Sequence, residues 1–511
     1  MKTKTPRRRL DVDVEELDRV IDATENGPLS RADRQKLKTT LHALVERLAR
    51  KRTTEKTSAV LEPKAPPANV DTPPEPERSS GRGHGRNAAD AFAGADKVAI
   101  AHPRLHSGDS CPGCNEGKVY RQKQPATLVR IIGQAPLKAT VFEMERLRCN
   151  ACGEVFTASP PQSAGAEKFD ATAVAMIALL KYGAGMPFNR MERLEGQLGI
   201  PLAAATQWEL MEAGAKPVKA VLDELIRFAA QGGVMHNDDT SMRVLKLVRA
   251  DDGRTGVFTS GIVSISGRWK IALYFTGWKH AGENLADVLR RRAAELDAPI
   301  QMCDALSRNT PKLPGVEVLL AHCLAHGRRQ VIDVAANFPE ESRYVLESLG
   351  AVYSFDAEAK RRGLTPEGRL AFHQSNSAPV MDELHQWLKN QFAERKTEPN
   401  SGLGKAISYL LRHWPELTLF LRQAGAPLDN NIAERMLKKA ILHRKNALFY
   451  KTMNGARVGD LFMSLIHTCE MNRVNPFGYL TELLRHPAEV AVRPAEWMPW
   501  NYRTDAAALA A

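Results

Sequence analysis

Along this chain the spacing of apolar residues changes from helical to strand-like and back to helical. Near the N-terminus, apolar residues recur in alternating steps of four and three, which predicts two short helices within residues 1–50. The first helix carries Leu10, Val14, Leu17 and Ile21, and the second carries Leu37, Leu41, Leu44 and Leu48. This helical headpiece either packs on itself or on a second copy, or contacts DNA through the arginines that precede it.

The two stretches that follow differ sharply in composition. Residues 51–98 are rich in Pro, Ala, Glu, Ser and Gly, so they cannot bury enough apolar surface to fold, and we predict a disordered, basic and Pro-rich linker. Helical spacing returns in residues 161–230, which we interpret as a helical DNA-binding segment. The run GIPLAAATQWELM within it fits either a helix-turn-helix unit or a plain helical packing domain.

Strand-like spacing begins near residue 231. The runs GGVMHNDDTSMRVLKLV, GVFTSGIVSI and RWKIALYF predict three strands, and Ser266-Gly267 between the last two predicts a tight hairpin. In the third run the apolar residues Trp269, Ile271, Leu273 and Phe275 stand at every second position. A helical run, GENLADVLRRRAAEL, then leads to the strand patterns APIQMCD and GVEVLLA.

Three antiparallel strands, a helix and two more strands are the element order of a ribonuclease-H-like fold. We therefore predict an α/β catalytic core of ribonuclease-H-like type over residues 231–460, with a helical insertion at about 322–425. A C-terminal helical segment follows at 461–511.

Three acidic residues fall where this fold would bring them together. Asp238 lies on the first predicted strand, Asp304 ends the fourth, and Glu434 lies near the start of a basic helix. Carboxylate oxygens are the ligands that Mg²⁺ prefers, and two such ions can activate an attacking oxygen and stabilise a leaving one. Each acid also has a plainer explanation: Asp238 as a turn residue, Asp304 as a helix cap, and Glu434 in a capping box with Asn431.

Four cysteines form the strongest local motif. Cys111 and Cys114, and then Cys149 and Cys152, are two CxxC pairs whose four thiolates match a tetrahedral structural Zn²⁺ site. The residues between the pairs suit a small β-ribbon, so we predict a zinc-ribbon domain over residues 99–160. Redox chemistry is the competing interpretation, although it needs only one CxxC pair.

The charge of the chain favours a polyanionic partner. Lys and Arg total 71 against 59 Asp and Glu, which gives a formal net charge of +12. No apolar stretch follows the basic N-terminus as a secretory signal requires, and no segment is apolar over a membrane-spanning length. We therefore expect a cytoplasmic protein that binds DNA and no membrane. The residues best suited to phosphate contact, with solvated surface charge as the alternative, are Arg328, Arg329, Arg435, Arg444 and Lys445.

Several runs resemble the signature segments of the insertion-sequence-66 family of bacterial transposases. They are HNDDT, CLAHGRRQ, SGLGKAISYLLRHW, LDNNIAER, HRKNALF and SLIHTCEMNRVNPFGYL. The resemblance extends over nearly the whole chain from about residue 80. It implies a DDE catalytic domain in which Asp238, Asp304 and Glu434 bind the catalytic metal. The family commonly has Asp-Glu where this chain has Asp238-Asp239, and spacing favours Asp238 as the ligand.

The same resemblance bears on partners and on one further motif. It implies assembly into a multimer on paired DNA ends and a need for small accessory proteins of the same element. Several DDE lineages have a CxxH like Cys323-Leu-Ala-His326, where it would steady the active site; on residue type alone these are a buried Cys and a satisfied His.

Together these features predict a DNA transposase that binds the terminal inverted repeats of an insertion sequence. With Mg²⁺ or Mn²⁺ at the acids and Zn²⁺ in the ribbon, it would cleave strands at the element's ends and transfer them into target DNA. Two alternatives stay open. A metal-dependent, structure-selective nuclease of the same fold would cut without joining, and a non-catalytic DNA-binding protein derived from a transposase would leave the ends intact.

Overall fold

The computed structural model describes residues 97–122, 126–129, 131, 135–152, 154–247, 253–312, 314 and 317–501, together with Thr57, Val60 and Ala95. The predicted headpiece lies outside the described residues, and so does nearly all of the predicted linker. Contacts divide the chain into two compact units, Lys64–Pro136 and Leu137–Ala511, and Thr57 and Val60 belong to the second.

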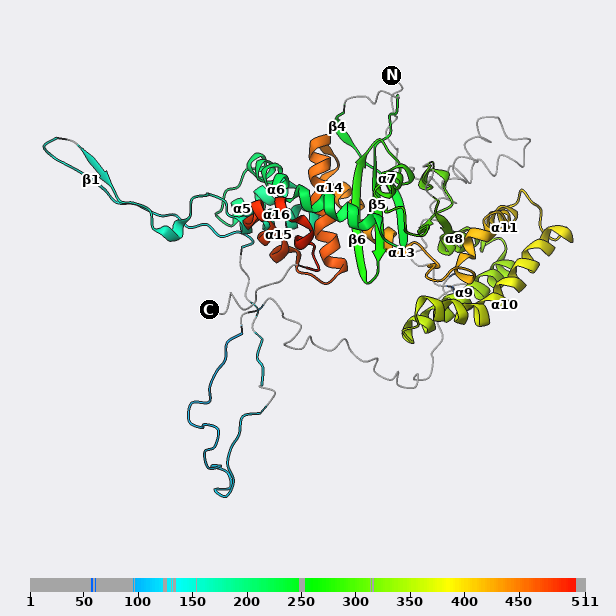
Figure 1. The fold of residues 1–511 in the computed structure, drawn as a ribbon, viewed down its shortest axis with the longest axis horizontal. Helices are drawn as coiled ribbons and strands as arrows, with labels where there is room; N and C mark the ends of the chain where they lie inside the picture. The colour runs from blue at the N-terminus through cyan, green and yellow to red at the C-terminus, as the bar shows by residue number, and fades with distance from the viewer. Residues whose placement is uncertain are drawn as a thin grey trace, which may run out of the picture. The chain divides into compact units, whose positions relative to one another are not determined.

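A five-stranded sheet forms the centre of the larger unit. Its strands are β3 (Val234–Ser241), β5 (Phe258–Ser266), β6 (Trp269–Gly277), β7 (Ile300–Cys303) and β8 (Leu319–His322). They lie in the order β6-β5-β3-β7-β8, and β5 runs opposite to the other four. Helix α7 (Ala281–Leu289) follows β6 and precedes β7 (Figure 1). This arrangement confirms the predicted mixed α/β core.

The first predicted strand is divided in the structure. β3 ends at Ser241, and a separate strand, β4 (Val244–Lys246), pairs in parallel with β9 (Tyr450–Thr452). Val244 and Tyr450 are buried there in a small apolar cluster of their own. The prediction of one continuous strand was therefore wrong, because a period of two does not reveal which sheet a strand joins.

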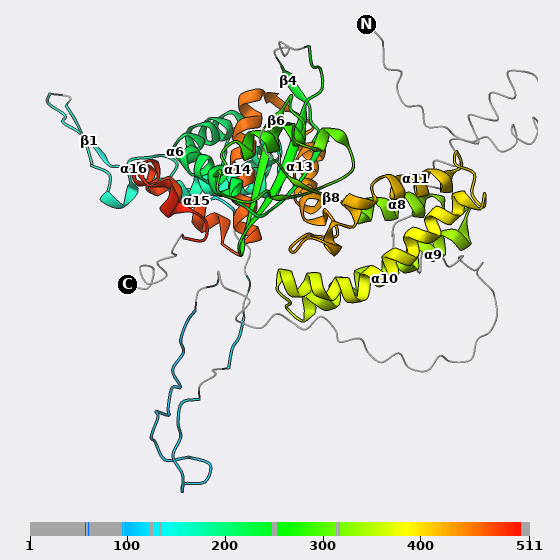
Figure 2. The same ribbon diagram turned by 45° about the vertical axis from the view of Figure 1, so that its right-hand side comes forward.

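Helices pack in two groups, each around its own apolar core. The first group contains α4 (Ala171–Ala178), α5 (Phe188–Gln197), α6 (Ala204–Ala230), α13 (Asn431–Ala447), α14 (Met453–Met471), α15 (Pro476–Arg485) and α16 (Pro487–Val492). The second contains α8 (Leu324–Val334), α9 (Pro339–Arg361), α10 (Pro366–Ala393), α11 (Gly402–Arg412) and α12 (Trp414–Leu417). Figures 1 and 2 show α8–α11 on one side of the sheet and α5, α6, α15 and α16 on the other. The second group falls in the range predicted for the insertion.

The run GIPLAAATQWELM, residues 199–211, holds the loop residues 199–203 and the first part of α6, and α5 ends before it begins. Met211, Val218 and Leu225 of α6 are completely buried in the first apolar core. Because a recognition helix must expose its N-terminal residues to DNA, this burial favours the plain packing interpretation for most of α6.

Helix α14 lies along the outer edge of strand β6 and replaces a neighbouring strand. Its polar side chains recur every four residues, and they accept hydrogen bonds from alternate backbone N–H groups of β6. The pairs are Asp460 with Thr276 (2.6 Å), Ser464 with Tyr274 (3.0 Å), Thr468 with Ala272 (3.0 Å), and Asn472, just past the helix, with Lys270 (3.1 Å). The edge strand is thereby closed to pairing with another chain.

This helix also explains why β6 differs from its pattern. The alternation of Trp269, Ile271, Leu273 and Phe275 predicts one buried and one exposed face. In the structure Ile271, Ala272 and Leu273 are all completely buried. Strands covered on both faces are apolar throughout, and Ala272 and Tyr274 complete that pattern here.

Asp460 makes the stability of this edge dependent on pH. Burial raises the pKa of its carboxyl group from 3.8 to about 7. Because the native state then holds its proton more tightly than the unfolded state, the contribution of this carboxyl group to stability is fully present below pH 4 and is lost as the pH rises through 7. We expect Asp460→Asn to be more stable than wild type at pH 8, on the order of 1.4 kcal/mol per unit of pKa shift, and equally stable at pH 4.

Urea unfolding at a series of pH values, reported as the difference between variant and wild type, measures this effect. Ser464→Ala is the matched control, because it removes the neighbouring acceptor without removing a titratable group. It should lower the free energy of unfolding by about 1–3 kcal/mol, and this decrease should not change with pH. If the difference in free energy of unfolding between Asp460→Asn and wild type were also independent of pH, the carboxyl group would have its ordinary pKa.

Candidate active site

Asp238 and Asp304 lie at the same edge of the sheet. β3 and β7 are parallel, with Val234 opposite Ile300 and His236 opposite Met302. Continuing this register by two residues places Asp238 opposite Asp304, directly beyond the end of β7. Neighbouring parallel strands thus present both acids at their carboxyl ends, where α/β proteins commonly bind ligands.

Helix α13 brings Glu434 to this edge. On the other side of β3, Asp238 is paired with Gly261 of β5. A side chain at Gly261 would meet Met436 and Leu437, so the glycine allows α13 to pack closely on the sheet. The Tyr274 hydroxyl donates to the Met436 carbonyl over 2.8 Å and fixes the helix there. Gly261 gives no local signal in the sequence, since its role depends on a helix far along the chain.

The three acids influence one another electrostatically. Burial, opposed by a hydrogen bond from the Asp239 amide and assisted by the negative charges of Asp304, Asp239 and Glu434, raises the pKa of Asp238 to about 7. Like charges that share a partly desolvated site disfavour ionisation. A divalent cation at this edge would remove that repulsion.

Asp239 is held differently from its neighbour. Its carboxylate contacts His280 Nδ1 at 2.7 Å and Arg308 Nη2 at 3.5 Å, and its side chain is only 2% exposed. Successive residues of a strand point to opposite faces. Asp239 therefore has basic partners from the protein itself, whereas the charges acting on Asp238 are those of the other acids.

A buried amide network holds Asp304. The Asn309 side chain donates to Asp304 Oδ1, and the Asn309 carbonyl accepts hydrogen bonds of 2.7 Å from both Asn237 and Gln301. Gln301 also donates to Asn237 over 2.8 Å. All three amide residues are completely buried. The explanation of Asp304 as the cap of a following helix does not hold, because its side chain serves this loop. The only local signal of this network in the sequence is polar residues within apolar strands, so the network was not predicted.

Glu434 is close to the CxxH pair. Cys323, His326 and Glu434 each offer one ligand atom, and these atoms lie within 4.8 Å of one another. Glu434 Oε1 lies 3.8 Å from His326 Nδ1, and both atoms are buried without a hydrogen bond. The plain interpretation expected a buried Cys323 and a His326 whose ring nitrogens have hydrogen-bond partners. It is wrong for His326, because Nδ1 has no such partner.

The capping-box explanation for Glu434 is also contradicted. Helix α13 has Asn430, not Asn431, as its N-cap, and no side-chain capping bond forms. Instead Asn430 Nδ2 donates to the Asn237 carbonyl over 3.0 Å, and Asn430 Oδ1 lies 3.1 Å from His236 Nδ1. Asn430 thus fastens the start of α13 to the strand that carries Asp238.

The predicted phosphate-binding residues occupy different positions. Arg435 and Lys445 are exposed on α13, while Arg328 and Arg329 on α8 are half-buried. Arg444 donates to Thr240 Oγ1 (2.9 Å) and to the carbonyl and hydroxyl of Ser241. Arg444 therefore anchors α13 to the end of β3, whereas the side chains of Arg435 and Lys445 are open to solvent.

The first predicted cysteine pair lies in a tight turn of the smaller unit. The Cys111 amide donates to the Gly117 carbonyl, and the Asn115 amide donates to the Cys111 carbonyl, both over 2.8 Å. Hydrogen bonds from the Gly117 and Glu116 amides lower the pKa of the Cys114 thiol. This turn favours the thiolate form that binds metal.

The second pair lies in the larger unit. Cys149 and Cys152 are in the turn between β1 (Arg146–Arg148) and β2 (Val155–Thr157), which pair antiparallel. The Cys149 amide donates to the Glu154 carbonyl over 2.9 Å. The boundary between the two units, at Pro136 and Leu137, falls inside the predicted zinc-ribbon domain.

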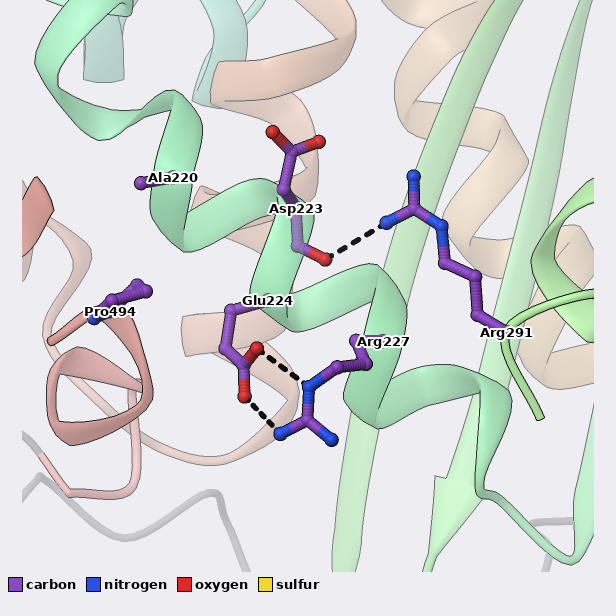
Figure 3. A pocket seen from close by; sticks show the side chains of 6 residues that line it. All are labelled: Ala220, Asp223, Glu224, Arg227, Arg291 and Pro494. Atoms are coloured by element: carbon purple, nitrogen blue, oxygen red, sulfur yellow. Dashed lines mark hydrogen bonds and ion pairs between the residues drawn. The ribbon is translucent and has the colours of Figure 1, made fainter. Parts of the chain in front are cut away.

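A surface pocket lies elsewhere, between α6 and the C-terminal residues. Figure 3 shows Ala220, Asp223, Glu224, Arg227, Arg291 and Pro494 around it. Arg227 pairs with Glu224, and Arg291 donates to the Asp223 carbonyl over 3.1 Å. These charged groups neutralise one another or hold the backbone, and none of the three acids lines the pocket.

Comparison with known proteins identifies the class of the chain. A sequence model described as "Transposase IS66 family" matches residues 167–458, a range that contains all three acids. The chain belongs to the IS66 family of transposases. Membership supports a transposase function, which implies polynucleotidyl transfer on DNA and suggests the use of a divalent metal.

Relatives of similar length occur in Sinorhizobium fredii (strain NBRC 101917 / NGR234). The protein described as "Uncharacterized protein y4jD" is 27% identical over 407 residues, which cover 77% of this chain and 78% of that protein. "Uncharacterized protein y4hP" is 26% identical over 421 residues, which cover 78% and 74%. No helix in the described part of the chain is both long and apolar enough to cross a membrane.

Proposed function

We propose that this chain is a DDE-type DNA transposase with a ribonuclease-H-like core, in which Asp238, Asp304 and Glu434 hold Mg²⁺ or Mn²⁺. The observation that carries the proposal is the convergence of three acids from separate elements on one edge of the sheet. The strand order, with only β5 reversed, supports the core assignment.

The residues present suit divalent cations. Glu434 Oε1 is buried without a hydrogen bond, and the charges of Asp304 and Glu434 act on Asp238. When bound, the ions would activate an attacking oxygen and stabilise a leaving oxygen at phosphorus. The buried amides around Asp304 and the Asn430 contacts to β3 would keep the carboxylates in place before DNA binds.

The proposed reaction has two steps at this site. Water attacks a phosphodiester at the end of the element, the bond to the 3′ oxygen breaks, and a 3′-hydroxyl is released. That hydroxyl then attacks a phosphodiester of the target DNA, so one phosphorus–oxygen bond forms as another breaks. Assembly on paired terminal repeats, with accessory proteins of the same element, belongs to this proposal.

The test uses a labelled duplex that carries the terminal repeat flanking the gene, with the element's accessory proteins present. We expect nicking and joined products in Mg²⁺ or Mn²⁺ and neither product in chelator. Nicking without joining would instead support the structure-selective nuclease. Binding without any cleavage would leave a DNA-binding protein derived from a transposase.

Phosphate binding by α13 gives a separate prediction. Replacing the exposed residues Arg435 and Lys445 with Ala should weaken DNA binding uniformly across sequences and reduce the slope of log K against log salt by about one unit per residue. Titrations by fluorescence anisotropy at several salt concentrations measure the slope. Arg485→Ala is the control, since this arginine pairs with Glu482 on α15, and a slope reduced equally by the control would contradict the assignment.

We also propose that Cys111, Cys114, Cys149 and Cys152 together hold one structural Zn²⁺ ion, as two CxxC pairs commonly do. Either Cys111→Ser or Cys149→Ser should then remove one equivalent of zinc, and the double substitution should remove no more. Elemental analysis of the purified full chain measures this loss, with the exposed Glu116→Gln as control. Losses that add in the double variant would mean that each pair binds its own metal.

A further inference from the structure

Three further potential metal ligands, none of them one of the three acids, meet where the sheet joins the helical insertion. His322 is the last residue of β8, His413 follows α11, and Glu416 lies in α12. Each offers one ligand atom, and the three atoms lie within 4.8 Å of one another. His322 and Glu416, which are 416 − 322 = 94 positions apart in the sequence, thus lie close together.

The convergence leaves buried polar atoms without partners. The His322 residue is 6% exposed, and its Nδ1 atom is buried and makes no hydrogen bond. Glu416 Oε2 is likewise buried without a hydrogen bond. An unsatisfied buried polar group costs about 1–3 kcal/mol, and a ligand bound by both residues would offset that cost.

Local structure prepares the three side chains for one ion. His413 and Glu416 are three residues apart, and the Leu417 amide donates to the His413 carbonyl over 2.9 Å, which closes the helical turn between them. Side chains at this spacing lie on one helix face. The His413 ring packs edge-on against His322, with centroids 5.0 Å apart at 75°. A strand end and a helical turn therefore hold the ligands rigidly.

We propose that His322, His413 and Glu416 bind a divalent transition-metal ion of the zinc class. Two imidazoles and one carboxylate are a ligand set that zinc favours, whereas Mg²⁺ prefers oxygen ligands alone. The site differs in donor type from the carboxylates near Asp238 and from the thiolates of the cysteine pairs. Three protein ligands leave a fourth position for water.

The proposed ion would fasten the helical insertion to the catalytic sheet. Cys323 follows His322 directly, and its Sγ accepts a hydrogen bond of 3.2 Å from the amide of Asn430. Asn430 starts α13, which carries Glu434. Metal bound at the end of β8 would thus steady the residues around the third acid. This role is structural, and it does not rest on the proposed strand-transfer activity.

The first experiment measures metal content in the full chain. The protein is stripped with chelator, reloaded with Zn²⁺, dialysed and subjected to elemental analysis. We expect the double variant His413→Gln with Glu416→Gln to hold one equivalent less zinc than wild type. His385→Gln is the matched control, because His385 stacks on Trp414 in the same turn, 4.4 Å between centroids, but lies outside the trio. Equal zinc in all three proteins would overturn the proposal.

A second measurement guards against a variant that fails to fold. In a variant with Ser at all four positions Cys111, Cys114, Cys149 and Cys152, which removes both cysteine pairs and keeps the trio, added Zn²⁺ should raise the melting temperature by several degrees, because the ion binds the folded state. Cobalt(II) bound to this protein should show no thiolate charge-transfer absorption, since its ligands are nitrogen and oxygen. An unchanged melting temperature, or a thiolate spectrum, would overturn the proposal.

Discussion

Replacing Glu434 with Gln should lower the rate of strand cleavage by about 10³-fold or more while the protein stays folded. If the carboxylate holds a metal ion that stabilises the transition state, it lowers the activation free energy of cleavage by several kcal/mol. Gln keeps the size of the side chain and removes its charge. Glu434 Oε1 makes no hydrogen bond in the structure, and its contact with His326 Nδ1 is long at 3.8 Å. The substitution therefore breaks no hydrogen bond of that oxygen, and stability should change little.

The neighbouring aspartates supply a sharper comparison. Asp238→Asn should lower cleavage as strongly as Glu434→Gln, because Asp238 lies opposite Asp304 in the strand register. Asp239→Asn should affect cleavage much less, since Asp239 pairs with His280 and Arg308. The cleavage rates of these two variants, which alter adjacent residues of one strand, are thus predicted to differ by orders of magnitude.

Single-turnover cleavage of a labelled terminal-repeat duplex, in Mg²⁺ and in Mn²⁺, measures these rates. Thermal melting of each variant checks that it is folded. Cleavage by Glu434→Gln at the wild-type rate would remove Glu434 from the site. If Asp239→Asn were inactive and Asp238→Asn active, the metal ligand would be the second aspartate of the pair.

Sequence patterns were sufficient for the core of the fold, because local signals determine it. The runs around β5, β6 and β7 are apolar, bounded by turns and separated by a helical segment. Asp304 stands out because it ends an apolar run. Once strand order is assumed, the carboxyl ends of β3 and β7 must share an edge, so two of the acids could be placed from the sequence.

The supporting contacts could not be predicted, because they join residues far apart in the chain. Asn430 lies within a sequence that favours capping of its own helix, yet His236 and Asn237 bind its side chain instead. The polar residues of α14 look like a solvated helix face, but they close the edge of β6. In each case a tertiary hydrogen bond replaced the local one that the pattern suggests.

The second large effect is expected at Asn430. Asn430→Leu leaves the His236 ring nitrogen and the Asn237 carbonyl without their partner in a site where Asn430 is 1% exposed and His236 is 3% exposed. At about 1–3 kcal/mol for each of these two unsatisfied groups, the free energy of unfolding should fall by about 2–6 kcal/mol. The start of α13 would also lose its attachment to β3, so cleavage should fall even in the folded fraction.

Urea unfolding and single-turnover cleavage, corrected for the folded fraction, separate the two effects. Asn431→Ala is the matched control, because Asn431 makes none of these side-chain hydrogen bonds to β3. This substitution should lower the free energy of unfolding by no more than about 0.5 kcal/mol. Asn430→Asp keeps an acceptor for His236 and loses the donor to Asn237. Its free energy of unfolding should therefore lie between those of Asn430→Leu and wild type. A folded Asn430→Leu protein that cleaves DNA at the wild-type rate would mean that Glu434 is positioned without Asn430, by the packing of Met436 and Leu437 on Gly261 alone.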